Sequence, residues 1–444
     1  MKNFTKCFIV LMALLVVGSA ASAASLADHV KIAPNQKGDL LFYPFYIAVD
    51  GGFDNKIVLI NTDLERSVVA KIVFRSWVNS EEVLDFLIYL SPADVWTGFV
   101  RFTANGPVIF STDGSALSAA NVFASAENPL NQPLFPVSCP NDSNQIGYIT
   151  VFESCSFIAS EWTGIVTPAS GERVTRPVSK SYIKRVYDSA TMQGLIPQQP
   201  VRDPDVDTRN VLAGYLEFGI PTAALNSIVR ATTLRDYNNL SVLGIGAETF
   251  IGEIAGNNLG EVEAAMNKNR LAAYYYNTET DFSFHFFTFP TKDTFAFIDL
   301  DDCVCSTSLQ GGVFWDGICT LTFSPQVFDL EENTVVQEDI FSGGDRIILK
   351  WPNEVNILTS LGFPFSEGWT NYVISVGPTS FYNDVEEFVE FDGVPVIGTL
   401  IHFKDLAFAM ERPAHDDGSV SVDGLDIPDY QYADFGPGMA PVPN

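Results

Sequence analysis

Residues 38–112 show the strongest alternation of hydrophobic and polar positions in the chain, and this alternation predicts a series of short β-strands. Runs rich in Val, Ile, Phe, Tyr and Trp are separated by polar turn clusters such as Asp50-Gly51-Gly52 and Ser91-Pro92. Within one run, Lys71 stands between apolar neighbours, as in a half-buried strand. The strands that we predict here are Leu40 to Ile47, Lys56 to Asn61, Val68 to Ser76, Leu84 to Leu90 and Val95 to Phe102.

Short strands at a spacing of about 8–12 residues, with polar turns between them, are typical of antiparallel β-sandwiches. We therefore predict a mainly β protein, built from antiparallel, immunoglobulin-like β-sandwich modules with one or two short helices. The N-terminal β-sandwich module is expected to span residues 24–112.

Residues 113–209 have a less regular pattern. Three prolines punctuate residues 128–136, which predicts loops. Val178 to Leu195 has apolar residues at helical spacing, and we predict a helix there. Ile196 to Arg209 is rich in Pro and polar turn formers, so we interpret it as a linker.

From residue 210 the strand pattern returns, and we assign residues 210–412 to a C-terminal β-rich module. One helix is predicted from Leu259 to Tyr276, because Glu261 falls in its first turn and Arg270 comes later, an order that suits the helix dipole. Residues 413–444 are rich in acidic residues, Gly and Pro, and we predict an extended tail. The predicted strands are Val211 to Phe218, Asp281 to Phe289, Phe295 to Leu300, Ile318 to Phe323, Arg346 to Trp351, Tyr372 to Val376 and Val394 to Phe403.

Residues 1–23 have the organisation of a secretory signal peptide. Lys2 and Lys6 precede an apolar run from Phe8 to Val17, and Ala21-Ser22-Ala23 follows as a small-residue cleavage site. The alternative is a membrane anchor, but the run is shorter than the roughly 20 residues that cross a bilayer. We therefore predict export, with no transmembrane span in the mature chain.

The composition excludes several classes of protein. The 444 residues include 25 Lys+Arg against 54 Asp+Glu, which gives a formal net charge of −29. A hydrophobic content of 47% with 13% aromatics excludes a disordered chain. Proteins bind the phosphates of nucleic acids mainly through Lys and Arg. A chain this acidic is therefore not expected to bind nucleic acid. Loss of residues 1–23 would remove two Lys and no acidic residue, making the charge more negative.

Five cysteines would remain after cleavage, and an oxidising compartment favours disulfides. Cys139 and Cys155 enclose a short polar loop and form a natural pair. Cys319 would then pair with Cys303 or Cys305, and the remaining thiol would stay free or bond between chains. The alternative is a zinc site with Cys303, Cys305 and Cys319 as ligands. It lacks the usual C-x₂₋₄-C pair and a nearby His, so we favour disulfides.

Five short motifs are scattered over most of the chain, and none is catalytic. They are Asp85 to Trp96, Phe289 to Lys292, Asp329 to Asn333, Asn353 to Leu358 and Gly393 to Gly398. Together they resemble a loosely defined family of uncharacterised exported proteins of Gram-negative bacteria. That family carries no established activity, so the resemblance implies export and a β-rich body but no site residues.

Motifs for common chemistry are absent from the sequence, which contains no H-E-x-x-H, G-x-S-x-G, G-x-x-x-x-G-K-[ST] or G-x-G-x-x-G. Ser181-x-x-Lys184 fits the S-x-x-K pattern of penicillin-recognising enzymes, but the companion S-D-N and K-T-G motifs are missing. His285 and His402 lie within aromatic strands, where we favour packed histidines over a general base or a ligand.

Calcium binding is the cofactor hypothesis that the sequence offers. Asp203, Asp205 and Asp207 supply acids at alternate positions, as the start of an EF-hand loop does. The loop then departs from the pattern, because Thr208 occupies the Gly position and Gly214 the position of the bidentate Glu. We keep these three aspartates as a calcium hypothesis beside the alternative of a solvated acidic loop. No other cofactor is expected.

These observations favour an exported, non-enzymatic surface or extracellular protein with a structural or adhesion role, acting as an acidic β-sandwich scaffold. Its expected partners are the chain itself or surface glycans, and its expected location is the periplasm, the cell surface or the medium of a Gram-negative bacterium. The alternative is a carbohydrate- or ligand-binding β-sandwich module. A third hypothesis is a secreted hydrolase with paired carboxylates, which needs a separation of about 5–10 Å in space.

Overall fold

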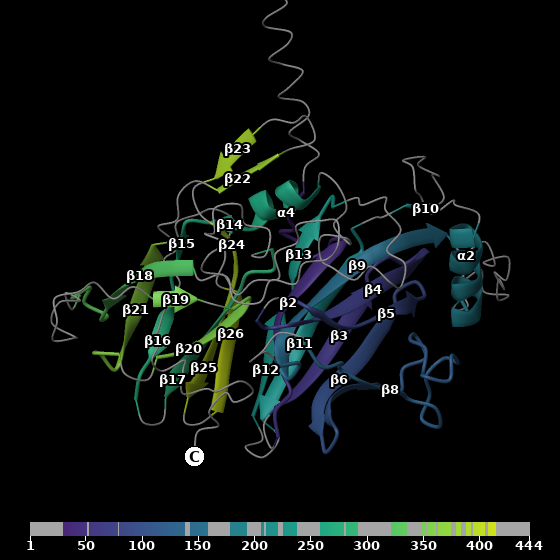
Figure 1. Cartoon of the computed structure of the whole chain (residues 1–444), viewed down its shortest axis with the longest axis horizontal. Coiled ribbons are helices and arrows are strands. Elements are labelled where there is room, and N and C mark those ends of the chain that lie inside the picture. The colour runs from purple at the N-terminus through teal and green to yellow at the C-terminus, as the bar shows by residue number, and fades with distance from the viewer. Residues whose placement is uncertain are drawn as a thin grey trace, which may run out of the picture.

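The chain forms a mainly β structure with antiparallel sheets, which confirms the predicted β-sandwich class (Figure 1). Of the predicted signal peptide and the tail, only Pro413 is among the described residues. The computed structural model describes residues 30–50, 53–78, 80–137, 143–158, 178–192, 206–207, 210–220, 225–237, 258–278, 281–291, 321–334, 349–351, 353–360, 363–373, 379–382, 388–391, 394–404 and 407–413.

Two large sheets dominate the described part of the N-terminal half. The seven-stranded sheet runs in the order β1 (Lys31–Ile32), β13 (Thr232–Arg235), β2 (Leu40–Ile47), β9 (Ile146–Ile158), β4 (Arg66–Ser76) and β5 (Glu82–Leu90), with β10 (Val206–Asp207) also paired to β9. The six-stranded sheet runs β12 (Leu225–Arg230), β11 (Leu212–Ile220), β3 (Asp54–Asn61), β6 (Val95–Thr103), β7 (Gly106–Ser111) and β8 (Leu130–Pro133). An immunoglobulin domain has about seven to nine strands in total, so this sandwich is larger than the predicted module.

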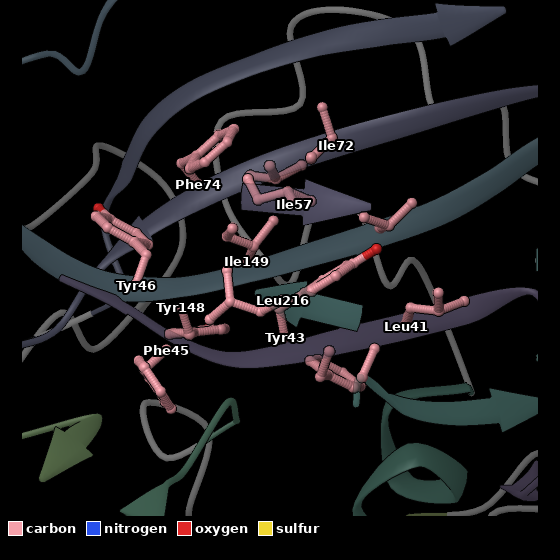
Figure 2. Packing of buried hydrophobic residues seen from close by; sticks show 14 of the residues in the cluster. Leu41, Tyr43, Phe45, Tyr46, Ile57, Ile72, Phe74, Tyr148, Ile149 and Leu216 are labelled. Atoms are coloured by element: carbon pink, nitrogen blue, oxygen red, sulfur yellow. The ribbon is translucent and has the colours of Figure 1, made fainter. Parts of the chain in front are cut away.

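The core of this sandwich is built from the inward side chains of both sheets. One glycine in it is sterically required. A Cβ at Gly214 would overlap the hydroxyl of Tyr43, whose Oη donates a 2.8 Å hydrogen bond to the Val58 carbonyl. Figure 2 shows fully buried side chains of both sheets packed together, among them Leu41, Tyr43, Ile57, Ile72 and Leu216.

Strand pairing crosses the boundary that the sequence suggested between residues 209 and 210. Strand β11 pairs with β3 from Leu212 opposite Asn61 to Gly219 opposite Asp54, and β13 pairs with β2. The thirteen-residue strand β9 lies where the sequence predicted a loop-rich segment. Both faces of β9 are buried, so it lacks the alternation that marks half-exposed strands.

The C-terminal half adds smaller antiparallel ladders. A four-stranded sheet runs β20 (Val355–Thr359), β17 (Phe282–Thr288), β25 (Ile397–Lys404) and β26 (Ala407–Pro413). A five-stranded sheet runs β15 (Arg270–Leu271), β21 (Glu367–Val373), β18 (Leu321–Phe328) and β19 (Leu349–Trp351), with β16 (Tyr274–Tyr276) also on β21. Two-stranded ladders pair β14 (Asn267–Lys268) with β24 (Val394–Pro395) and β22 (Thr379–Tyr382) with β23 (Phe388–Phe391).

Alternate residues of β17 enter two different cores. Phe286 joins the core of the first sandwich and stacks on Phe45 of β2, with ring centroids 3.8 Å apart. Phe287 points the other way, into a second core between the four- and five-stranded sheets. The backbone N–H of Val355 donates to the carbonyl of Trp77 at 2.9 Å. The C-terminal sheets therefore pack directly on the first sandwich.

Two helices are present in the described residues. Helix α2 (Lys180–Met192) confirms the helix predicted from Val178 to Leu195. Helix α4 (Asn258–Met266) begins where predicted, but the prediction of helix as far as Tyr276 is wrong. Residues 274–276 are three tyrosines, which favour strand, and they pair with β21 instead. Neither helix has the length and apolar character needed to cross a membrane.

The outer side of the seven-stranded sheet, which we call the covered face, is closed off where α2 lies on β4 and β5. Ile183 and Tyr187 of α2 pack against Val69 and Tyr89. Lys71, on the same side of β4, is fully buried and forms a 2.8 Å ion pair with Asp85. This face is therefore part of the folded interior.

Candidate functional site

The outer side of the six-stranded sheet is the candidate binding surface, and we call it the open face. Successive side chains of a strand point to opposite sides, and the inward residues of this sheet, such as Trp96 and Leu216, belong to the core. The outward apolar and aromatic residues of the open face are the exposed or partly exposed Ile60, Val95, Phe99, Phe110, Tyr215 and Ile228, together with Val58 and Val108, which are buried.

Several of these apolar side chains protrude from the sheet. Ile228 is 53% exposed, Val95 42% and Phe99 37%, whereas Trp96 beside Val95 on the same strand is 0% exposed. The exposed residues come from β12 and β6, and Tyr215 of β11 lies between those strands with intermediate exposure. The face thus presents large exposed apolar groups on β12 and β6, two strands of the same sheet.

The charges on the open face differ from those of the chain as a whole. Its outward charged residues are three basic and two acidic, although acidic residues outnumber basic ones two to one in the sequence. Lys56 Nζ pairs with Glu217 at 2.8 Å, and both side chains are partly exposed. The guanidinium of Arg101 lies 4.5 Å from the centre of the Phe110 ring. The five charged residues are Asp54, Lys56, Arg101, Glu217 and Arg230.

The two strand histidines, by contrast, are enclosed. His402 of β25 lies opposite Ser283 of β17, and its Nδ1 is 2.7 Å from the serine Oγ. His285 also lies on β17, two residues after Ser283. His285 is 1% exposed and His402 is 5% exposed, so neither presents a base to a substrate.

Burial has a direct electrostatic effect on His285. Desolvation of its imidazolium, and then the nearby His402, hold the pKa of His285 well below its ordinary value. No hydrogen-bond partner of its Nε2 occurs among the described residues. His285 is therefore a neutral, packed side chain at neutral pH.

A second polar cluster joins α2 to the turn between β5 and β6. Lys180, the first residue of α2, forms an ion pair with Asp94 and donates to Ser91 Oγ at 3.2 Å. The Ser91 hydroxyl and backbone N–H each donate to the same Asp94 carboxylate at 3.0 Å. Burial lowers the pKa of Lys180 to about 8. The serine proton points to the carboxylate, so this is a network that positions the helix.

No sequence pattern pointed to this Ser91, Asp94 and Lys180 cluster, because Lys180 lies far from the turn along the chain. The sequence did contain the pattern Ser181-x-x-Lys184, but on α2 these two side chains have different surroundings. Lys184 pairs with Asp188 one turn later at 2.6 Å, and Ser181 is exposed.

The aspartates of the calcium hypothesis are only partly visible. Asp203 and Asp205 lie outside the described residues, and Asp207 is known only by its backbone, opposite Ser156 of β9. Within the described part of the chain, no group of three His, Cys, Asp or Glu side chains could hold a metal ion. Calcium binding at Asp203, Asp205 and Asp207 stays a prediction.

Among the predicted disulfide cysteines, only Cys155 is described, and it is a free thiol. It lies on β9 opposite Val69 and is buried under α2 at 3% exposure. Burial, with the nearby Glu153 carboxylate, raises the pKa of this thiol well above its ordinary range. The structure gives no support to the disulfide predicted with Cys139. Cys139, Cys303, Cys305 and Cys319 lie outside the described residues.

Comparison with known proteins gave no match: no family model fits the chain, and no curated protein or solved structure is detectably similar to it. The resemblance to exported proteins of Gram-negative bacteria therefore stays a prediction.

Proposed function

We propose that the protein is an exported, non-enzymatic structural or adhesion protein of the cell surface or extracellular space, an acidic β-sandwich scaffold that binds its partner through the open face. The observation that carries this proposal is the exposure of Val95, Phe99 and Ile228 on one side of a single sheet. Exposed apolar groups bordered by polar ones mark interaction sites. Aromatic and Arg side chains are also enriched in the buried parts of protein interfaces.

The charge distribution supports the same surface. A net charge of −29 repels other acidic surfaces, including a second copy of the chain. The open face carries Lys56, Arg101 and Arg230 among its apolar groups, so it is a place where a partner can approach with little repulsion. The signal-peptide pattern of residues 1–23 supports export.

The test is binding of the purified, labelled chain to washed cells of the source organism that lack their own copy. We expect the double variant Phe99→Asp and Ile228→Asp to bind at least about ten-fold more weakly, because a carboxylate buried in an apolar contact costs free energy. Its melting temperature should be unchanged.

Leu64→Asp is the matched control. Leu64 is 73% exposed but lies in the turn between β3 and β4, so the same charge change there should leave cell binding intact. Wild-type binding by the double variant would overturn the proposal. Fractionation that places the native protein in the cytoplasm would overturn the export component.

A second candidate function, carbohydrate binding, is favoured by the aromatic side chains of the open face. Phe99 of β6 and Tyr215 of β11 are outward residues on strands that flank β3, and their rings combine an apolar surface with, for Tyr, a polar group. Phe99→Ala should abolish any sugar binding detected on a glycan array, while Phe135→Ala, a 55% exposed residue outside this face, should not. An array without signal in all sugar classes would contradict it.

A further inference from the structure

Lys71 of β4 is enclosed by apolar side chains on the covered face. It is fully buried, and residues directly opposite each other on antiparallel strands share one side of the sheet. The neighbouring positions on that side of the sheet hold Val69 and Val73 on β4, Leu87 on β5 and Phe152 on β9, all of them buried. Water therefore has little access to the Lys71 ammonium group, and a charge without water is costly.

A carboxylate lies beside this buried amine. Asp85 of β5 is diagonal to Lys71 across the strand pair, and its Oδ2 lies 2.8 Å from Lys71 Nζ. The Asp85 side chain is 12% exposed, so it borders solvent while the amine does not. Removal of both charges from water can cost more free energy than their attraction returns. The same surroundings favour transfer of a proton from Nζ to the carboxylate, which leaves an uncharged amine beside an uncharged acid.

An uncharged amine in contact with a carboxylic acid can form an amide. We propose that Lys71 and Asp85 become joined by an isopeptide bond, a covalent modification of the covered face, and that the observed contact is the arrangement before the bond forms. Nζ attacks Cγ of Asp85, and the bond from Cγ to one carboxyl oxygen breaks. That oxygen leaves as water, with two protons of the original ammonium group, so no oxidant or other reactant is needed.

The fold favours this reaction in two ways. The paired strands β4 and β5 hold the amine and the acid in contact, so the reaction is intramolecular and avoids the entropy cost of bringing two reactants together. The partial exposure of Asp85 gives the released water a route to solvent. Because the Lys71 side is dry, little water is present to hydrolyse the amide once it has formed.

The open face contains an ion pair for direct comparison. Lys56 Nζ and Glu217 Oε1 are also 2.8 Å apart, but their side chains are 31% and 24% exposed. Water solvates both of these charges, so the Lys56 amine stays protonated and cannot attack the carboxyl group. We therefore expect an isopeptide bond at the buried pair and none at the exposed pair.

The bond would tie β5, the last strand of the seven-stranded sheet, to β4. A covalent link between strands restricts the unfolded chain and keeps β5 from separating from the sheet. This property suits a structural or adhesion protein of the cell surface. The inference does not depend on binding through the open face, so its failure would leave the cell-binding tests unchanged.

The test is mass spectrometry of the purified full-length chain after reduction of its cysteines. We expect a mass lower than that of the unmodified chain by one water molecule. Trypsin cuts after Lys and Arg, and it should not cut after a modified Lys71. The digest should therefore contain residues 67–75 joined to residues 76–101 as one branched peptide. Lys56 and Glu217 should be recovered on separate, unmodified peptides.

Lys71→Arg is the matched control variant. Its guanidinium keeps a positive charge beside Asp85 but stays protonated, so it cannot attack the carboxyl group. This variant should have the full mass. A wild-type chain of full mass, with trypsin cleavage after Lys71, would overturn the inference. Loss of one water without the branched peptide would overturn it as well, because an aspartate that cyclises onto its own backbone also loses water.

Discussion

The two outer faces of the large sandwich contain ion pairs of the same length in opposite surroundings. Lys71 and Asp85 on the covered face are 2.8 Å apart, with side chains 0% and 12% exposed. Lys56 and Glu217 on the open face are also 2.8 Å apart, with side chains 31% and 24% exposed. The ion pairs on the two faces therefore do not differ in contact distance, but they differ in their exposure to water.

This difference assigns a separate role to each face. On the covered face, α2 and the β-sheet bury polar and apolar groups together, and each of them contributes to folding. On the open face, similar residue types meet solvent and contribute little to the fold. Groups that the fold does not need are available to a partner, which is why we place binding there.

The largest expected effect is the loss of Lys71. Lys71→Met leaves the Asp85 carboxylate at a largely buried site without its cation, and we expect unfolding to require about 3–5 kcal/mol less free energy. The measurement is urea denaturation followed by tryptophan fluorescence. Lys56→Met is the matched control, with an expected loss of about 1 kcal/mol or less for a partly exposed pair. Equal losses for the two variants would remove the contrast between the faces.

An isoleucine on each face provides an apolar version of the same comparison. Ile183 of α2 is fully buried, whereas Ile228 of β12 is 53% exposed. Ile183→Ala should cost about 2–4 kcal/mol through lost burial and a cavity. Ile228→Ala should cost about 1 kcal/mol or less. The same denaturation experiment measures both, and a large loss at Ile228 would show that the open face belongs to the folded interior.

The enclosed His285 extends the comparison to pH. Its pKa in the folded protein is below its value of about 6.5 in the unfolded chain. The unfolded chain therefore binds the proton first, so the contribution of His285 to stability is constant above about pH 6.5 and falls below it, by at most about 1.4 kcal/mol per pH unit. His285→Phe should remove that slope, measured as the difference in unfolding free energy between pH 7.5 and pH 5.5. An unchanged slope would contradict a buried neutral His285.

Cys155 tests how well α2 closes the covered face. Because its thiol is buried and its pKa is raised, we expect alkylation of the native protein to be at least about a hundred-fold slower than alkylation of the unfolded protein. Peptide mass spectrometry measures the label. In denaturant without reductant Cys155 should become labelled, whereas recovery of a peptide that joins Cys139 to Cys155 would show the disulfide instead.

Local sequence patterns predicted strands that are apolar, β-branched and aromatic runs, both the half-exposed β6 and the fully buried β2. Leu40 to Ile47 was predicted with the bounds of β2, and Val95 to Phe102 is one residue shorter than β6. Strand β9 was missed because its sequence neither alternates nor forms a continuous apolar run: Glu153, Ser154 and Ser156 are buried among its apolar residues. The helix predicted at α4 was too long because the order of charged residues did not indicate where the helix ends. The pairing of Tyr274–Tyr276 with β21 is decided by tertiary contacts.

The candidate site was harder to predict than the strands. The alternation from Val95 to Thr103 shows that one side of β6 faces the core, but it does not show whether the other side is covered. That outcome depends on α2, which lies on the other sheet, and on β11 and β12, which join the sheet from residues 212–230. Such long-range pairing cannot be predicted from the pattern of a single segment of sequence.

The most direct test of the central claim replaces one side chain at a time with the photo-cross-linker benzoylphenylalanine, at position 99 on the open face and at position 64 outside it. The purified chains are bound to washed cells, irradiated and separated by mass. Position 99 should give adducts with a cell-surface macromolecule, and position 64 should give none. Full cell binding by the position 99 chain without any adduct, or equal adducts from both positions, would contradict docking through the open face.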